Sequence, residues 1–193
     1  MSEELKQKIT TFTMLVKDQF VYGGKKYALE EKRESTDLLF DIFGANWLYG
    51  TMSKYCFRFV NLQRERDLLK IACYSYLLWL KRGFFIDDKR AIPLDTNIKI
   101  KKECFGQFIN KAREFVLEEY SSSILSYFKE KTNNLINKIF YILKNFATLE
   151  WKKVEEKFLL EIFSLSFIVW VRKFGHEKNH DTDTWLEKEV KNG

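Results

Sequence analysis

Residues 65–82, ERDLLKIACYSYLLWLKR, decide the fold of this 193-residue chain. A helix drawn through this stretch carries apolar side chains on nearly every side, which indicates a central helix buried among others. The single proline and eight glycines of the whole chain permit long helices and disfavour a turn-rich β-sandwich. We therefore predict an all-α protein that folds as a compact helical bundle.

Helical spacing of apolar residues predicts more helices on both sides of this stretch. Before it, with breaks at Gly23-Gly24 and Gly44, we expect helices over residues 4–21, 27–43 and 48–63. After it, we expect helices over residues 102–119, 121–147 and 150–174. The region between contains the only proline and has no helical period. We thus expect an N-terminal helical unit (1–84), a linker (85–102), a C-terminal helical unit (103–175) and a polar tail (176–193).

The two halves share an order of features. Residues 54–84 and 138–175 each contain an aromatic helix, a charged break and a very apolar helix. Each apolar helix ends in Trp, two basic residues, and a Gly beside a Phe. An internal duplication explains this order. Two buried amphipathic hairpins would also share it by chance, and the sequence leaves both explanations open.

Charge and cysteine usage restrict the partners and the compartment. The formal net charge of +6 permits an anionic partner, such as a nucleotide or a nucleic acid, without requiring one. The three cysteines have no metal-type spacing, so we predict reduced thiols in a cytoplasmic protein. The most apolar run, residues 158–171, is too short to span a bilayer, and we expect no membrane partner.

Four carboxylates follow the Gly-Gly pair on one predicted helix. Glu30, Glu34, Asp37 and Asp41 are spaced so that they share one stripe of that helix. Like charges at this spacing repel one another unless water, a Mg²⁺ ion or facing cations neutralise them. The stripe therefore predicts either a solvated acidic face or a polar site between helices.

The order of features from residue 22 to residue 87 resembles the MazG-like all-α nucleoside triphosphate pyrophosphohydrolases. The matching segments are YGGKKY at 22–27, Glu31-Lys-Arg-Glu34 as a Glu-x-x-Glu motif, and DLLKIACYSYLLWLKRGFFID at 67–87. They cover about a third of the chain. The resemblance implies Mg²⁺-dependent cleavage between the α and β phosphates by an activated water. In that family the active unit is usually built from two subunits. The resemblance therefore implies either a homodimer or a single chain whose second half supplies the partner helices.

The resemblance also implies roles for particular residues. Glu31 and Glu34 would be the catalytic pair, and Asp37, Asp41 and Asp67 would bind Mg²⁺. The cations expected to bind phosphate are Lys25, Lys26, Lys54, Arg58 and Lys70. Lys70 stands where the family has a metal-binding carboxylate, and an ammonium there repels Mg²⁺. The chain is therefore expected to be either a pyrophosphohydrolase with a rearranged site or an inactive nucleotide-binding relative.

Two other readings compete with this one. A non-enzymatic subunit could bind nucleic acid or a protein partner through basic faces with interleaved aromatics. The residues concerned are Arg58, Arg64, Arg66, Lys70, Lys81 and Arg82, with Tyr55, Phe57, Tyr74 and Trp79, although core packing would equally explain these rings. In the tail, His176 and His180 have a spacing found in zinc sites, and a frayed polar tail is the simpler interpretation.

Overall fold

The computed structural model describes residues 3–27, 35–84, 98–118, 130–150 and 153–175, and within this part of the chain the regular structure is helical. The helices are α1 (Glu3–Tyr27), α2 (Ser35–Phe43), α3 (Ala45–Leu62), α4 (Glu65–Arg82), α5 (Ile98–Glu118), α7 (Thr132–Thr148) and α8 (Glu156–Lys173). The prediction of an all-α helical bundle is confirmed.

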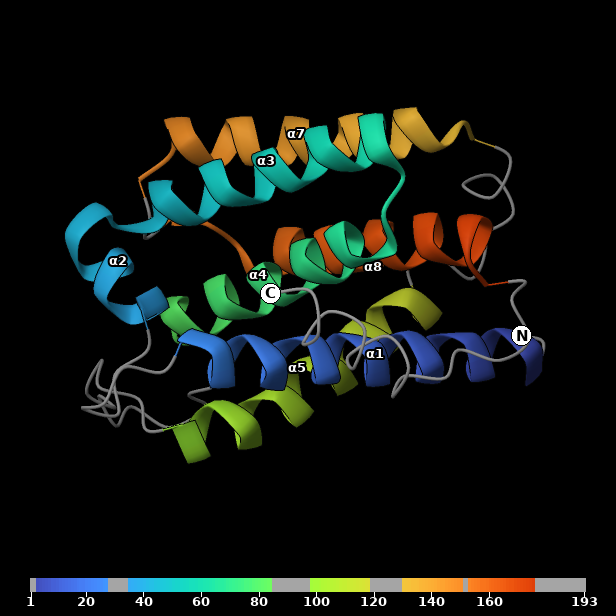
Figure 1. Cartoon of the computed structure of the whole chain (residues 1–193), viewed down its shortest axis with the longest axis horizontal. Coiled ribbons are helices and arrows are strands. Elements are labelled where there is room, and N and C mark those ends of the chain that lie inside the picture. Colours follow the sequence, from blue (N-terminus) through green and yellow to red (C-terminus); the bar gives the residue numbers. More distant parts are fainter. Residues whose placement is uncertain (1–2, 28–34, 85–97, 119–129, 151–152, 176–193) are drawn as a thin grey trace.

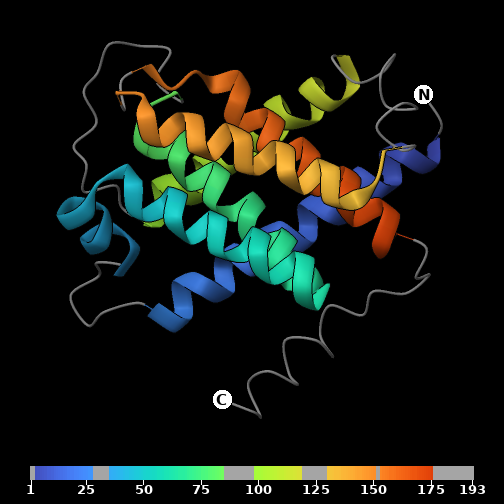
Figure 2. The ribbon, with the colours of Figure 1, turned by 90° about the horizontal axis from the view of Figure 1, so that it is seen from above.

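The helices form three layers (Figure 1). The middle layer consists of α4 and α8, whose mutual contact is the most extensive in the molecule. Helices α3 and α7 lie side by side on one side of it, and α1 and α5 lie on the other (Figures 1 and 2). The short helix α2 packs against α3 at one end of the bundle. Buried apolar side chains from both halves form one core.

Helix α4 has the bounds expected from the sequence and is the central helix that its composition indicates. From Asp67 to Leu80, only Lys70 and Tyr74 are not fully buried. The helix ends at Gly83, whose φ of 83° lies in the left-handed region that favours glycine. The predicted all-round burial of this stretch is therefore confirmed.

Reciprocal hydrogen bonds join the two central helices. Trp79 Nε1 near the end of α4 donates to Glu156 Oε1 at the start of α8, at 2.6 Å. Trp170 Nε1 near the end of α8 donates to Glu65 Oε1 at the start of α4, also at 2.6 Å. Glu65 and Trp79 have the same separation in sequence as Glu156 and Trp170. The two helices are thus antiparallel and make the same contact twice.

The surrounding layers repeat this symmetry. The ring of Phe12 in α1 lies 5.5 Å from that of Trp170, and the ring of Phe108 in α5 lies 5.6 Å from that of Trp79. The buried positions of α3 and α7 also follow the same spacing: Leu48, Tyr49, Met52, Tyr55, Cys56 and Phe59 against Leu135, Ile136, Ile139, Ile142, Leu143 and Phe146. These equivalences support the relation between the halves that the sequence suggested.

The predicted turn at Gly23-Gly24 is wrong, because α1 continues through both glycines to Tyr27. Glycine inside a helix costs about 1 kcal/mol relative to alanine. Tertiary contacts hold the turn of α1 that precedes the glycines: the Phe20 ring stacks on Phe105 at 5.6 Å, and Arg66 lies over the Tyr22 ring at 5.4 Å. Tyr27 belongs to α1 and not to the helix predicted at 27–43. Residues 28–34 lie outside the described residues, and the described part of that prediction is α2.

Three other predicted boundaries need correction. The linker ends earlier than expected, because residues 98–102 already belong to α5. Helix α7 begins only at Thr132, after a bend at residues 130–131. Helix α8 begins only at Glu156, since Glu155 has extended backbone angles and the preceding Val154 inserts its side chain into the core. The backbone carbonyl of Val154 accepts a hydrogen bond from Arg82 Nε at 3.3 Å, which ties this segment to α4.

Candidate functional site

A pocket of about 280 Å³ lies among the first four helices. Its lining comes from α1 (Gln19, Phe20, Gly23), α2 (Thr36, Leu39), α3 (Trp47, Thr51, Lys54, Tyr55) and α4 (Lys70, Cys73, Tyr74, Leu77). Its volume lies just below the range of about 300–1,000 Å³ that is usual for small-molecule sites. The wall combines aromatic rings with two ammonium groups and two threonine hydroxyls.

The ring of Tyr55 organises the charged side of this pocket. Lys70 Nζ lies 4.8 Å from the ring centre and Lys54 Nζ lies 5.1 Å from it. Lys70 Nζ also donates a hydrogen bond to the Tyr55 hydroxyl at 3.2 Å. Both lysines therefore lie beside the π face that attracts cations.

Two further aromatic residues continue from Tyr55 along the wall. The Tyr74 ring is stacked against Tyr55 with 5.9 Å between ring centres. Trp47 meets Tyr74 edge to face at 6.1 Å. The three side chains come from α3 and α4, so the contact between these helices fixes the shape of the wall.

The ammonium group of Lys70 has an altered acidity. Burial above all, together with the nearby guanidinium groups of Arg66 and Arg58, lowers the pKa of Lys70 to about 8, while Asp67 opposes the change. Below pH 8 the pocket therefore contains a partly desolvated cation. An anionic ligand would stabilise this charge by adding to the counter-charge that Asp67 already supplies.

Asp67 is the one fully buried carboxylate among the residues that the structure describes. Arg58 Nη2 lies 3.4 Å from Asp67 Oδ1, and neither carboxylate oxygen has a hydrogen-bond partner within the described ranges. Burial raises the pKa of Asp67, and the cations around it, Arg58 above all, counteract this effect. Asp67 thus acts as a buried counter-charge for Arg58 and Lys70.

Several predicted site residues cannot be placed. Glu31 and Glu34, the predicted catalytic pair, lie outside the described residues. Asp37 lies in α2, and Lys25 and Lys26 lie in the last turn of α1, but their side chains are outside the described part of the structure. Their predicted roles therefore stay predictions.

The described carboxylates do not fit a Mg²⁺ site. Asp41 is exposed on α2, whereas Asp67 is buried beside Arg58, and neither lines the pocket. A metal ion at Asp67 would meet the positive charges of Arg58, Arg64, Arg66 and Lys70. No group of three His, Cys, Asp or Glu side chains in the described part of the chain lies close enough together to hold a metal ion.

The three predicted phosphate-binding cations whose side chains are described divide into two groups. Lys54 and Lys70 line the pocket. Arg58 lies outside the lining and pairs with Asp67. Gln19, Trp47 and Thr51 also line the pocket, and sequence reasoning missed them because no motif marks them.

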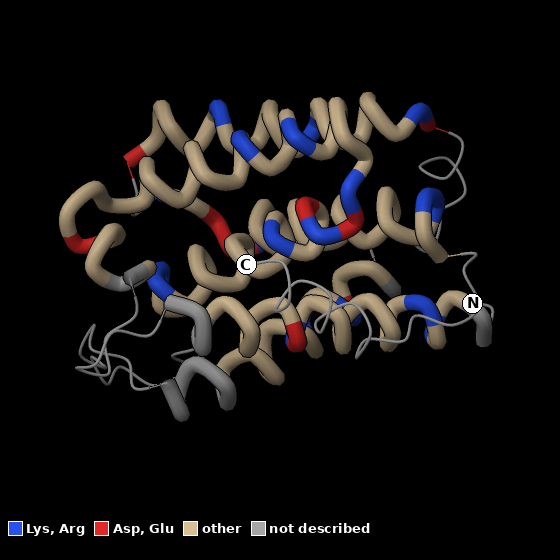
Figure 3. The backbone as a smooth tube through the Cα atoms, in the orientation of Figure 1, with Lys and Arg blue, Asp and Glu red and all other residues tan. Residues whose placement is uncertain are grey.

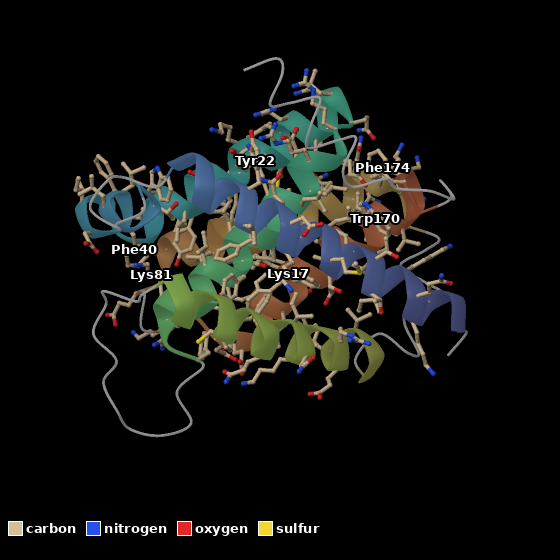
Figure 4. All side chains as sticks on the ribbon, turned by 60° about the horizontal axis from the view of Figure 1, so that its bottom comes forward. Lys17, Tyr22, Phe40, Lys81, Trp170 and Phe174 are labelled. Atoms are coloured by element: carbon tan, nitrogen blue, oxygen red, sulfur yellow. The ribbon has the colours of Figure 1, made fainter. Side chains whose placement is uncertain are left out.

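The basic, aromatic face predicted around α4 needs correction. Trp79 is fully buried and Tyr55 is nearly so, so these rings belong to the core instead of a stacking surface. Lys81 and Arg82 lie at the opposite end of α4 from Arg64 and Arg66, and Lys81 lies against the Phe40 ring at 5.1 Å (Figure 4). These cations therefore do not form one continuous patch.

The cysteines and the membrane prediction can be examined directly. Cys56, Cys73 and Cys104 are all unbridged and buried, as predicted for reduced thiols. The Cys73 thiol donates to the Val16 carbonyl at 3.3 Å. Among the described helices, none has the length and apolar character needed to cross a membrane.

No protein-family model matches this chain, and neither a curated protein nor a solved structure matches it.

Proposed function

We propose that this protein binds a nucleotide in the pocket formed by α1 to α4, as a divergent relative of the MazG-like pyrophosphohydrolases. The observation that carries the proposal is the pairing of two ammonium groups, Lys54 and Lys70, with the partly exposed aromatic side chains of Trp47 and Tyr74 in the pocket wall. Phosphate is attracted by the ammonium groups, and a planar base is attracted by aromatic faces. The pocket supplies both kinds of contact.

Three residues of the pocket lining come from segments that carry the resemblance. Gly23 belongs to the YGGKKY segment, although it is helical here, and Thr36 and Leu39 belong to the predicted acidic helix. Lys70 occupies the place of a metal-binding carboxylate. Because an ammonium at that place favours phosphate over Mg²⁺, binding without hydrolysis is the function we favour.

Calorimetric titration with nucleoside mono-, di- and triphosphates tests the proposal. We expect wild-type protein to bind, Lys70→Gln to lose about tenfold or more in affinity, and Lys153→Gln, at an exposed lysine remote from the pocket, to bind normally. Absence of binding by wild-type protein to every nucleotide would refute the proposal.

Hydrolysis is tested separately. Pyrophosphate release would be measured with Mg²⁺ or Mn²⁺ for the common nucleoside triphosphates, with Glu34→Gln as the control. Release that this substitution abolishes would identify a pyrophosphohydrolase that tolerates Lys70. Binding without release would identify a nucleotide-binding relative that has lost catalysis.

A further inference from the structure

The outer layer formed by α3 and α7 has an unusual charge distribution. Neither helix contains an Asp or a Glu, although each of the other described helices contains at least one. The chain has 27 acidic residues among 193, so about five would fall in two helices of this combined length if acids were evenly spread. Figure 3 shows the result: along α3 and α7 the coloured bands are blue.

The same layer is exposed on one side. Helices α3 and α7 contact each other and cover α4 and α8, and their outer face is seen in Figure 2. The cations Lys54, Arg58, Lys138 and Lys144 all lie outside the buried positions of these helices. The nearest acids in sequence, Glu130 and Glu150, lie beyond the two ends of α7. Lys138 is paired with Glu130 at 2.9 Å, and Arg58 with Asp67.

Large aromatic side chains are exposed among these cations. Phe57 of α3 is 62% exposed and Tyr141 of α7 is 67% exposed. Phe57 meets Phe140 edge to face, with 4.6 Å between ring centres, so the aromatic groups of the two helices lie together. Exposed rings of this size are costly in water and are typical of surfaces that bind a partner.

We propose that the outer face of α3 and α7 binds single-stranded nucleic acid. We define this face by Lys54, Phe57 and Arg58 of α3 and by Lys138, Tyr141 and Lys144 of α7. Lysine and arginine neutralise backbone phosphates, and exposed aromatic rings stack on unpaired bases with little regard to sequence. Two helices that contribute cations and exposed rings but no carboxylate of their own match this chemistry better than that of an uncharged partner, which would not require helices without acids.

This inference stands apart from the nucleotide pocket. Of the six residues that define the face, Lys54 alone also lines the pocket. Substitutions on α7 therefore test the face without altering the pocket. Tyr141 and Lys144 are both exposed, so their replacement leaves the core intact.

Fluorescence anisotropy with labelled RNA and DNA strands of about 16 nucleotides provides the test. We expect wild-type protein to bind, with affinity that falls steeply between about 50 and about 200 mM salt. Tyr141→Ala should weaken binding about tenfold. Lys144→Gln should make binding less dependent on salt: in a plot of the logarithm of the binding constant against the logarithm of the salt concentration, the slope should become smaller in magnitude by about one.

Matched controls lie elsewhere on the surface. Met14→Ala in α1 removes an exposed apolar side chain outside the face, and Lys153→Gln before α8 removes an exposed charge outside it. Both variants should bind nucleic acid as the wild-type protein does. The proposal is overturned if wild-type protein binds no strand at low salt, or if the face variants and the controls behave alike. It is also overturned if sedimentation shows a homodimer that Tyr141→Ala dissociates, because the face would then be covered by a second copy.

Discussion

At the residue scale, one ring organises the charges of the first half. Three cationic groups, those of Lys54, Arg58 and Lys70, lie within 5.5 Å of the centre of the Tyr55 ring. One buried carboxylate, Asp67, accompanies them. Removing single members of this cluster should therefore change stability and binding in different ways.

The first prediction concerns the pair of Arg58 and Asp67. Arg58→Gln leaves the buried carboxylate without its nearest counter-charge and should lower the free energy of unfolding by about 1–3 kcal/mol at pH 7. The pKa of Asp67 is already raised in the folded state, and loss of Arg58 raises it further. The destabilisation should therefore shrink as the pH falls through the raised pKa, where the carboxyl takes up a proton. Urea unfolding from pH 7 to pH 4 measures this.

A double variant separates this explanation from loss of arginine packing. Adding Asp67→Asn to Arg58→Gln removes the buried charge and should restore most of the lost stability. If the double variant is as unstable as Arg58→Gln alone, the carboxylate is not the cause.

The second prediction concerns the pH dependence of nucleotide affinity. Since the folded-state pKa of Lys70 is about 8, its ammonium is mostly charged at pH 7 and mostly neutral at pH 9. Nucleotide affinity should fall about tenfold over this range if phosphate binds the charged form, whereas Lys70→Arg should abolish the fall. Calorimetric titration of the wild-type protein and of Lys70→Arg at pH 7, 8 and 9 measures these affinities. Equal wild-type affinity at pH 7 and pH 9 would contradict a contact between Lys70 and phosphate.

Little of this site could be predicted from the sequence. Only the family resemblance indicated Lys54 and Lys70 among the phosphate-binding cations. It did not indicate Trp47 or Gln19, since no local motif marks a residue that reaches a pocket through tertiary packing. It also placed Asp41 and Asp67 in one metal site, although their burial differs completely.

At the element scale, the bounds of α4 followed from the sequence because a long apolar stretch with charged ends is closed by Gly83. The boundaries at Gly23, Thr132 and Glu156 did not follow from it. Two tertiary contacts near these places are the stacking of Phe20 on Phe105 in α1 and the burial of Val154 before α8. Neither contact is visible in a local window of sequence.

The third prediction concerns the reciprocal bonds between α4 and α8. Glu65→Ala removes the acceptor of the buried Trp170 indole and should lower the free energy of unfolding by about 1–3 kcal/mol. Glu156→Ala should cost at least as much, because Lys111 Nζ also bonds Glu156 Oε1, at 2.8 Å. Chemical denaturation monitored by tryptophan fluorescence measures both.

The two losses should add in the double variant, because the bonds lie at opposite ends of the helix pair. Lys153→Gln, a change at an exposed lysine outside both contacts, is the control for altered surface charge. A double variant no less stable than either single variant would show that the two contacts are not independent.

At the scale of the whole molecule, the two halves share one core. The side chains of α4 and α8 bury each other, and Phe12 of the first half and Phe108 of the second both contact Phe163, at 5.4 and 5.5 Å. A division into independent folding units would have to break this contact. The division predicted from the sequence thus describes the order of the helices along the chain better than their packing.

The fourth prediction follows from the shared core. Heating or urea should unfold the protein in one cooperative transition, with equal calorimetric and van't Hoff enthalpies. A fragment of residues 1–84 should have little stable structure alone, because the face of α4 that α8 covers would be exposed. Calorimetry of the full chain and circular dichroism of the fragment measure these outcomes. Two separated transitions would contradict the prediction.

The repeated arrangement of α3–α4 and α7–α8 within one chain also has an evolutionary consequence. In a homodimer every substitution appears in both copies, so neither copy can specialise alone. Joined halves can diverge position by position while the shared framework stays intact. The positions equivalent to Lys70 and Tyr55 in the second half are Glu161 and Ile142. The joined framework thus carries a lysine in one half and a glutamate at the equivalent place in the other.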